Sequence, residues 1–304
     1  MQSQIEQTRQ PVLRTGRAAL IEGSGFLRDR HIESARLDAE VLLRHVLEMD
    51  PTDFYMAIDG TLNPRAEERF RQLLRRRGRR EPLAYITGRK EFWSLDFVVT
   101  LDVLIPRPET EFLVDVALER VRQVPAKPAL NVLDLCTGSG AIAVSLAKEL
   151  ADSHITALDI SAAALAIARL NAENHGLAAR MQFAQGDLFE PLGEQGKRFD
   201  LIVSNPPYVR RRDLARLAVE IRNWEPVIAL DGGDEGLDFY RRIVADARKY
   251  SAPTGLIALE IGEDMADAVV RLFAADSGYE PAAVYRDYAG KDRVVTARVI
   301  GARG

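Results

Sequence analysis

Cysteine is almost absent from this 304-residue chain, which has Cys136 and no other. A single cysteine excludes an intrachain disulfide and a cysteine cluster for zinc, and it is typical of a reducing compartment. The four histidines have no metal-binding spacing, so we expect no metal site. No apolar run approaches the ~20 residues that a membrane span needs, and the polar N-terminus lacks the apolar core of a signal peptide. We therefore expect a cytoplasmic protein without a membrane partner.

Charge is spread unevenly along the chain. Residues 1–90 hold 17 lysines and arginines against 13 acidic residues (+4), and the remainder holds 24 against 32 (−8), which together make the net charge of −4. The acidic total and the lack of a continuous basic face argue against a nucleic-acid substrate, because binding DNA or RNA requires phosphates to be neutralised. The length suggests about two domains of ~150 residues each.

Residues 1–82 are predicted to form a small helical bundle, because no strand pattern occurs there. Ser34 can cap a helix that Asp50-Pro51 ends. Asn63-Pro64 pairs a capping residue with proline at the first helical position, so another helix is expected to begin there. The apolar residues expected on the buried face of the first helix are Leu37, Val41, Leu42, Val46 and Leu47.

The second of these helices is rich in arginine between residues 65 and 80. This run is either a surface for nucleic acid or an acidic partner, or a solvated helix face that Glu67 and Glu68 partly neutralise. The sequence leaves both interpretations open.

Residues 83–104 contain aromatic and β-branched residues and are predicted to form a β-hairpin that links two domains. The next segment, Ile-Pro-Arg-Pro-Glu-Thr-Glu at 105–111, is a stiff turn that feeds a helix. Its prolines either fix the direction of Arg107 or simply start a helix whose acidic residues suit the helix dipole.

From residue 130 onward, predicted strands alternate with predicted helices, which is typical of an α/β fold. Strands are expected at 131–135, 155–158, 181–184, 201–204 and 255–261. Helices are expected at 141–150, 162–175, 237–247 and 266–273, and a closing hairpin at 285–287 and 293–299.

The most informative stretch is the predicted strand at 201–204 with the loop Asn205-Pro206-Pro207-Tyr208. The strand is an apolar run suited to the centre of a parallel sheet, and the prolines, which lack an N–H, end it abruptly. Ligands bind at the carboxyl ends of strands in such sheets. Asn205 Oδ1 and the Pro206 carbonyl can each accept one N–H of a planar –NH₂ group, while the Tyr208 ring lies against its plane. On this motif alone, a plain proline-rich turn is the alternative interpretation.

Three other strand ends carry residues suited to a nucleoside. Gly138 and Gly140 allow a tight turn and close approach of a ligand at a helix N-terminus. Asp159, after the next strand, can bridge two ribose hydroxyls. Asp187, after the third, can accept from an adenine amino group while Leu188 packs on the ring. Each strand end thus offers one part of a nucleoside pocket.

The glycine pattern Gly138-x-Gly140-x-x-Ala143 also fits dinucleotide-binding proteins. Asp134 favours S-adenosylmethionine over NAD, because a carboxylate there can meet an ammonium group, directly or through water, and would repel a pyrophosphate. The loop at 205–208 also lacks a catalytic His or Lys for hydride transfer. An NAD-binding oxidoreductase and a non-enzymatic binding module are the alternatives.

In these residues the chain resembles the class I methyltransferases and, within them, the protein-(glutamine-N5) methyltransferases of peptide chain release factors, the PrmC/HemK family. The Asn-Pro-Pro-Tyr motif alone also admits DNA adenine-N6 and RNA guanine-N2 methyltransferases, and the turn at 105–111 with the helical front domain narrows the choice. The matching motifs, which span nearly the whole chain, are Ala84 to Gly88, Glu91 to Trp93, Ile105 to Glu111, Asp134 to Gly140, Asn205 to Tyr208, Glu225-Pro226 through Leu230, and Gly290 to Arg293.

The resemblance implies three parts: a helical substrate-binding domain at 1–82, a β-hairpin linker at 83–104, and a Rossmann-like, S-adenosylmethionine-dependent methyltransferase domain at 105–304. It implies methylation of the side-chain amide of the glutamine in the Gly-Gly-Gln motif of release factors, its expected partners, which the front domain would hold. We expect a monomer and no direct nucleic-acid substrate.

The same resemblance implies the site residues. Cys136 stands where many relatives have glycine, which we expect to matter little, and Leu188 stands where some have an aromatic residue, so adenine packing is expected to be looser. The residues expected to act on the substrate are Asn205, Pro206, Pro207 and Tyr208. Those expected to bind the cofactor are Thr110, Asp134, Cys136, Thr137, Gly138, Ser139, Gly140, Asp159, Asp187, Leu188 and Asn205.

Overall fold

The computed structural model describes residues 14–123, 127, 129–193 and 197–301. The chain divides into two compact units, Met1–Thr87 and Gly88–Gly304, and each has hydrophobic clusters of its own. The sequence predicted a front domain that ends at residue 82. The first unit instead extends to Thr87, because Leu83–Thr87 form a short helix, α5, whose Ile86 packs into the core of that unit.

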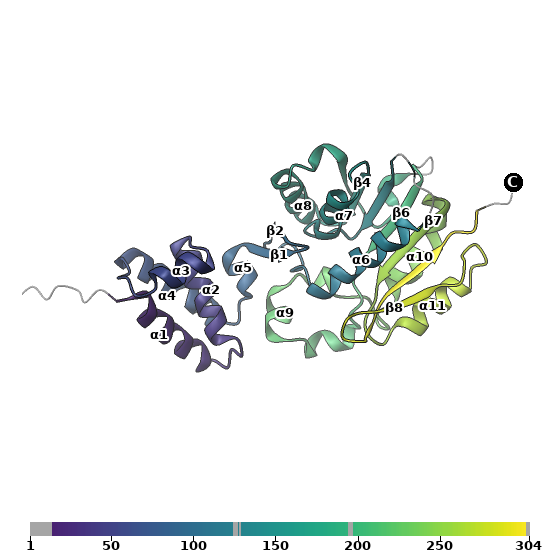
Figure 1. Ribbon diagram of the computed structural model, residues 1–304. Helices are drawn as coiled ribbons and strands as arrows, with labels where there is room; N and C mark the ends of the chain where they lie inside the picture. Colours follow the sequence, from purple (N-terminus) through teal and green to yellow (C-terminus); the bar gives the residue numbers. More distant parts are fainter. Residues whose placement is uncertain (1–13, 124–126, 128, 194–196, 302–304) are drawn as a thin grey trace, which may run out of the picture. The chain divides into compact units, whose positions relative to one another are not determined.

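The described part of the first unit is helical, as Figure 1 shows. Asn63 caps α4 by accepting a hydrogen bond from the Ala66 N–H at 2.7 Å, as predicted. Asp50-Pro51 was expected only to end a helix, but it also starts one, because Asp50 accepts from the Asp53 N–H at 2.9 Å. The helices of this unit are α1 (Gly16–Arg28), α2 (Ala35–Leu47), α3 (Pro51–Ala57), α4 (Pro64–Gly78) and α5.

The buried face of α2 differs from the one that the sequence predicted. Leu37 is 60% exposed, whereas its neighbour Asp38 is buried. The reason is a buried ion pair: Arg77 of α4 places its Nε 2.6 Å from Asp38 Oδ2. The hydrophobic pattern of the sequence alone could not predict the buried face of α2, because a charged residue is buried only where a partner of opposite charge is also buried beside it.

The remaining arginines of α4 include several on its exposed side. Arg71 binds Glu67 at 2.7 Å and Arg75 binds Glu68 at 3.0 Å, so the two glutamates neutralise part of the run as expected. Such exposed pairs contribute little to stability, because water and salt screen the charges.

The second unit contains a seven-stranded sheet with the strand order β5-β4-β3-β6-β7-β9-β8. Strand β6 occupies the centre, as predicted for the run at 201–204, and it pairs in parallel with β3 and β7. The last two strands form the expected antiparallel hairpin. The strands are β3 (Asn131–Leu135), β4 (His154–Asp159), β5 (Met181–Gln185), β6 (Phe199–Ser204), β7 (Ser251–Glu260), β8 (Ala283–Arg286) and β9 (Asp292–Arg298).

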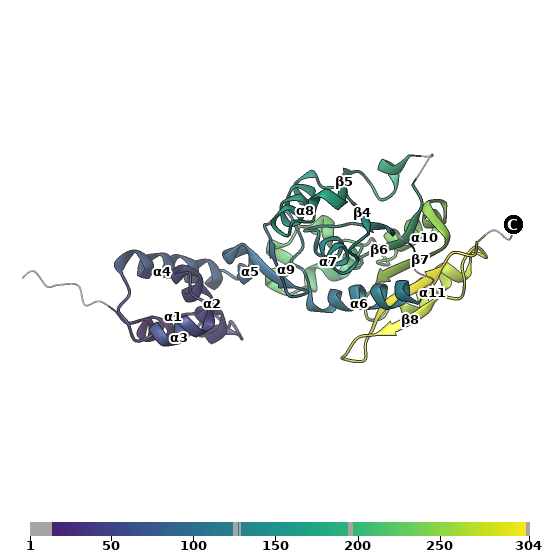
Figure 2. The same ribbon diagram turned by 45° about the horizontal axis from the view of Figure 1, so that its top comes forward.

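Helices cover both faces of this sheet (Figure 2). Helices α6 and α7 pack on one face with the alternate residues Val132, Val203 and Ala258, and α10 and α11 pack on the other. This alternation fits a parallel sheet that is buried on both sides. The helices are α6 (Pro108–Arg122), α7 (Ala141–Glu149), α8 (Ala162–Asn174), α9 (Val219–Trp224), α10 (Asp238–Tyr250) and α11 (Ala266–Ala274).

A two-stranded hairpin, β1 (Arg89–Phe92) and β2 (Leu95–Val98), opens the second unit. Its two-residue turn, Trp93-Ser94, has positive φ at both positions (55° and 54°), which is the type I′ geometry that suits the twist of a hairpin. Phe92, Leu95 and Phe97 are part of the core of the second unit. The hairpin therefore belongs to this unit by its packing.

Within the described residues, no helix combines the length and the apolar character that crossing a bilayer requires.

Candidate active site

The carboxyl ends of four parallel strands border one pocket in the second unit. This arrangement unites the four strand ends that the sequence singled out. Lining residues follow β3 (Cys136, Gly138), β4 (Asp159), β5 (Asp187, Leu188) and β6 (Asn205, Pro207). Pro206, Tyr208, Thr110, Asp134, Thr137, Ser139 and Gly140 do not line this pocket.

The loop between β3 and α7 shapes one wall of the pocket. Gly138 and Gly140 both have positive φ (54° and 80°), a conformation that glycine adopts without strain. Asp159 accepts hydrogen bonds from the backbone N–H groups of Gly138 and Ser161, each at 2.9 Å. Burial raises the pKa of Asp159, and these backbone bonds act in the opposite direction. The carboxylate expected to meet the ribose is thus held at the pocket wall by the glycine loop.

Asp134 lies behind this wall and is fully buried. Its Oδ2 accepts from the Thr137 hydroxyl at 2.6 Å, and its Oδ1 has no hydrogen-bond partner among the described residues. Burial raises the pKa of Asp134 to about 7. A buried carboxylate oxygen without a partner is costly, and a cationic group or a water molecule at the glycine loop would satisfy it.

Asp187 and Leu188 follow β5 at the opposite side of the pocket. Asp187 forms an ion pair with Arg242 of α10 at 2.8 Å, so the acceptor expected for an adenine amino group already holds a cation. No pattern in the sequence marks Arg242, because its contact with Asp187 joins distant segments. Leu188 is buried and has a positive φ of 50°, which is unusual for a bulky residue and is found mainly at functional sites.

Asn205 follows the central strand directly. Its Nδ2 donates to the hydroxyl of Thr110, the third residue of α6, at 3.2 Å. Tyr208 is half-buried, and burial raises the pKa of its hydroxyl well above the ordinary range, with Glu260 acting in the same direction. The hydroxyl therefore stays protonated.

The turn at 105–111 is clamped to the segment that follows the Asn205 loop. Arg107 binds Glu225 at 2.5 Å, and the other Glu225 oxygen accepts from the Ile105 N–H at 3.3 Å. The direction of Arg107 is thus fixed, and a helix also starts at Pro108, so both interpretations of this turn hold. Only the resemblance pointed to Glu225-Pro226.

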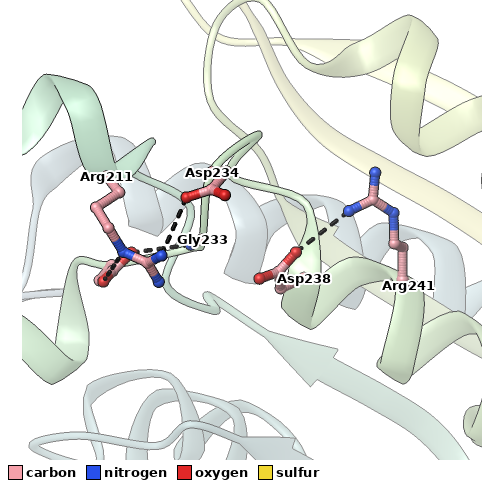
Figure 3. Close-up of polar contacts among 6 residues, drawn as sticks. Arg211, Gly233, Asp234, Asp238 and Arg241 are labelled. Atoms are coloured by element: carbon pink, nitrogen blue, oxygen red, sulfur yellow. Dashed lines mark hydrogen bonds and ion pairs between the residues drawn. The ribbon is translucent and has the colours of Figure 1, made fainter.

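The chain after Tyr208 folds back on itself. Val209 pairs with Leu230 and Gly232 through backbone bonds of 2.8 and 2.9 Å. Arg211 binds Asp231 at 3.1 Å and Asp234 at 3.0 Å, and Figure 3 shows its contact with Asp234. A side chain at Gly232 would come within 2.6 Å of the Tyr208 backbone, so glycine is required there. These contacts hold the loop Asn205–Tyr208 from its carboxyl side.

The donor set of the pocket fits a nucleoside that carries a positive charge. Three carboxylates, of Asp134, Asp159 and Asp187, lie at or behind its wall, and Arg242 is already paired with one of them. A pyrophosphate would meet net negative charge. No group of three or more metal-ligating side chains occurs within the described ranges.

Two protein-family models match the chain. Residues 18–88 match the PrmC N-terminal domain and residues 114–221 match the methyltransferase small domain. Among solved structures, a methyltransferase from Pyrococcus furiosus has a TM-score of 0.51 with 19% identity and covers 70% of this chain and 92% of its own. The hMettl16 catalytic domain has a TM-score of 0.54 with 16% identity, covering 69% and 77%. These similarities show the Rossmann-like methyltransferase fold that the sequence predicted.

Curated relatives match over almost the full length. The release factor glutamine methyltransferase of Geobacter sulfurreducens is 46% identical over 292 residues, which is 96% of this chain and 99% of the relative. That of Moorella thermoacetica is 44% identical over 283 residues, 93% of this chain and 98% of the relative. The chain therefore belongs to the family of release factor glutamine methyltransferases.

Proposed function

We propose that this protein transfers a methyl group from S-adenosylmethionine to the side-chain amide nitrogen of the glutamine in the Gly-Gly-Gln motif of peptide chain release factors. The observation that carries the proposal is the hydrogen bond from Asn205 Nδ2 to Thr110 beside the four-strand pocket. With Nδ2 occupied, Oδ1 is the Asn205 atom that accepts an N–H from a substrate amide.

Methyl transfer to an amide depends more on the orientation of the amide nitrogen than on a general base. An amide nitrogen is a poor nucleophile because its lone pair is delocalised. Asn205 Oδ1 and the Pro206 carbonyl accept its two N–H bonds, turn the nitrogen toward the methyl group and favour the positive charge that develops on it. Pro207 and Tyr208 wall the glutamine side chain. No general base is needed during transfer, because the proton leaves afterwards.

The cofactor, when bound, supplies an activated methyl group. The Gly138 loop would hold its methionine end, where the carboxylate of Asp134 would attract the ammonium group. Asp159 would bind the ribose hydroxyls. Asp187 would accept from the adenine amino group, and Arg242 would then share Asp187 or move away from it. Leu188 would pack against the ring.

The first unit, with its arginine-rich helix, is the proposed holder of the release factor. A monomeric enzyme suffices for this scheme, since all the proposed site residues come from one chain. An enzyme that modifies release factors works where translation takes place, so the proposal places it in the cytoplasm and gives it a protein, not a nucleic acid, as substrate.

The test is mass spectrometry of a purified release factor after incubation with this protein and S-adenosylmethionine. We expect the mass of one methyl group on the Gly-Gly-Gln peptide, absent when that glutamine is alanine. Asn205→Ala should lower turnover by roughly 100-fold or more, the scale of losing a transition-state hydrogen bond, with cofactor binding kept. The exposed Asn174→Ala serves as the matched control.

Two outcomes would overturn the proposal. Methylation of DNA or tRNA with an unmodified release factor would assign the protein to the amino-methyltransferases of nucleic acids. Near-normal turnover in Asn205→Ala would refute the proposed role of the loop.

A further inference from the structure

The pocket at the strand ends has a second wall, which comes from two connecting segments of the second unit. One segment, residues 102–104, precedes the turn at 105–111, and the other, residues 226–229, follows α9. Most of the side chains here are apolar, which suits contact with the uncharged parts of a nucleoside. We call these residues the second wall, and those that line the pocket are Asp102, Val103, Leu104, Pro226, Ile228 and Ala229.

One carboxylate joins the two segments of the second wall. Glu225 comes directly before residues 226–229, and its side chain is 1% exposed. One of its oxygens accepts from the Arg107 guanidinium at 2.5 Å, and the other accepts from the Ile105 N–H at 3.3 Å. Ile105 in turn comes directly after residues 102–104. The proposed mechanism gives Glu225 no role, so a buried charge at this junction calls for an explanation.

The segment 226–229 depends on its two ends for its position. Glu225 and Leu230 are buried, whereas none of the four residues between them is buried, and Ile228 is 56% exposed although it lines the pocket. At the carboxyl end, the Val209 N–H donates to the Leu230 carbonyl at 2.8 Å. At the amino end, the anchor is Glu225. A segment with so little core packing moves easily once an anchor is lost.

A carboxylate suits this junction better than any neutral side chain. Ile105 is buried and precedes α6, so its N–H belongs to no helix or strand and needs an acceptor of another kind. Both carboxylate oxygens accept, so Glu225 holds a backbone N–H and a guanidinium at the same time. A glutamine at this position would accept through one oxygen only, and its –NH₂ group would face the second donor.

We propose that Glu225 is a positioning residue that holds the second wall in place for the cofactor. The inference rests on the proposed function, because it takes the pocket as the site of S-adenosylmethionine. With the Glu225 contacts made, the segment 226–229 lies beside the segment 102–104 before the cofactor arrives. Without them the wall is in place for only a fraction of the time, and the apparent affinity for the cofactor falls by that fraction.

Glu225→Gln tests this role with almost no change in size. We expect its dissociation constant for S-adenosylmethionine, measured by calorimetry, to rise roughly 10-fold, the ratio for a wall that is in place about a tenth of the time. The KM for the cofactor should rise in parallel. At saturating cofactor, kcat and the KM for the release factor should stay close to the wild-type values, because the bound cofactor restores the wall.

A role in folding alone predicts a different result. If Glu225 served only the fold, its loss would lower the unfolding temperature and the fraction of folded protein, and the folded fraction would bind the cofactor with wild-type affinity. Calorimetry separates the two cases, because the number of sites reports the folded fraction and the dissociation constant reports the state of the wall.

Arg107→Met tests the same contact from its other side. It removes the guanidinium and should also weaken cofactor binding. The double variant with Glu225→Gln should bind the cofactor no more weakly than the weaker single variant, because both changes break one junction. Arg107 is 28% exposed, so Arg107→Met carries the test should Glu225→Gln fail to fold.

Asp276→Asn is the matched control. Asp276 also accepts from an arginine, Arg248 at 3.2 Å, and from a backbone N–H, that of Gly278 at 2.8 Å. It belongs to the same unit but does not line the pocket. Its variant should bind S-adenosylmethionine as the wild type does.

The results separate this inference from the proposed function. A wild-type protein that does not bind S-adenosylmethionine, or that leaves the Gly-Gly-Gln peptide unmodified, refutes the function itself. An active wild type with a Glu225→Gln variant of equal cofactor affinity refutes the positioning role and leaves the function standing. Losses that multiply in the double variant, or an equal loss in Asp276→Asn, refute it as well.

Discussion

At the scale of single residues, the second unit contains two buried acidic side chains whose charged forms are disfavoured by burial. Asp134 and Glu260 are both enclosed, and burial raises the pKa of each to about 7. A carboxyl whose pKa is raised on folding favours the native state while it is protonated and disfavours it once ionised. Both residues therefore reduce the stability of the ligand-free protein at neutral and alkaline pH.

Asp134→Asn tests this reduction. The folded protein binds the Asp134 proton more tightly than the unfolded chain does between pH 3.8 and about 7, so wild-type stability falls as pH rises through that window. At pH 8 the variant should be more stable by up to about 4 kcal/mol, from about 1.4 kcal/mol for each pH unit. Toward pH 4 the difference should vanish, as denaturant titrations at several pH values will show.

Asp152→Asn, at an exposed position, is the control, and its free energy of unfolding should equal that of the wild type at either pH. A gain in Asp134→Asn that did not depend on pH would contradict the argument. The variant should also bind S-adenosylmethionine more weakly, because it lacks the charge that we propose attracts the ammonium group.

The residues that the sequence identified are those whose chemistry depends on their position at a strand end. Asp159, Asp187 and Asn205 lie at the pocket because a strand and its turn are local features. Arg242 went unnoticed for the opposite reason. Its ion pair with Asp187 joins α10 to the loop after β5, and nothing in its own neighbourhood in the sequence marks it.

At the scale of elements, one side chain fastens the first hairpin to the glycine loop. Asn171 of α8 is fully buried. It accepts from the Val98 N–H at 2.8 Å and donates to the carbonyl groups of Val98 and Ser139 at 3.0 and 2.9 Å. The helix thereby holds β2 and the glycine loop between β3 and α7 in one arrangement.

Asn171→Ala should lower the free energy of unfolding of the second unit by about 3 kcal/mol, since it leaves buried backbone groups without partners. Weaker cofactor binding should accompany this loss, because Ser139 is in the glycine loop. Urea titration and calorimetry measure the two effects. Asn174→Ala, at an exposed position three residues later in α8, should change neither stability nor cofactor binding. An Asn171→Ala variant with wild-type stability and cofactor binding would contradict the proposed role of Asn171.

Elements with a clear local signal were predicted closely. The strand at 131–135 has the same bounds in the structure, and the helix at 162–175 differs by one residue at its end. The helix α3 was missed, because Asp50-Pro51 is a stop signal and a start signal at once. Strand order was not predictable, since pairing between distant strands leaves no mark within either one.

At the scale of the whole molecule, each unit has its own hydrophobic core. Chains with separate cores commonly unfold in more than one step. We expect two thermal transitions, one for each unit. The buried Asp38–Arg77 pair lies in the first unit, and the pocket proposed for the cofactor lies in the second.

S-adenosylmethionine should therefore raise the temperature of one transition alone. At 100 times its dissociation constant it should stabilise the second unit by about 2.7 kcal/mol. Asp38→Ala should lower the temperature of the other transition alone. It should reduce the free energy of unfolding of the first unit by about 3 kcal/mol or more, because it leaves Arg77 buried without this partner. Differential scanning calorimetry resolves both. A single transition that shifts as a whole in both experiments would show that the units unfold together.

The order of the strands has a consequence for how the protein is made. Strand β9, which follows the other six strands of this sheet in the chain, lies between β7 and β8 and not at an edge of the sheet. Until residues 292–298 leave the ribosome, β8 has no neighbouring strand and β7 is an unpaired edge. The sheet of the nascent chain thus remains open while all its other strands are already made, and we expect chaperones to bind this exposed apolar edge during that interval.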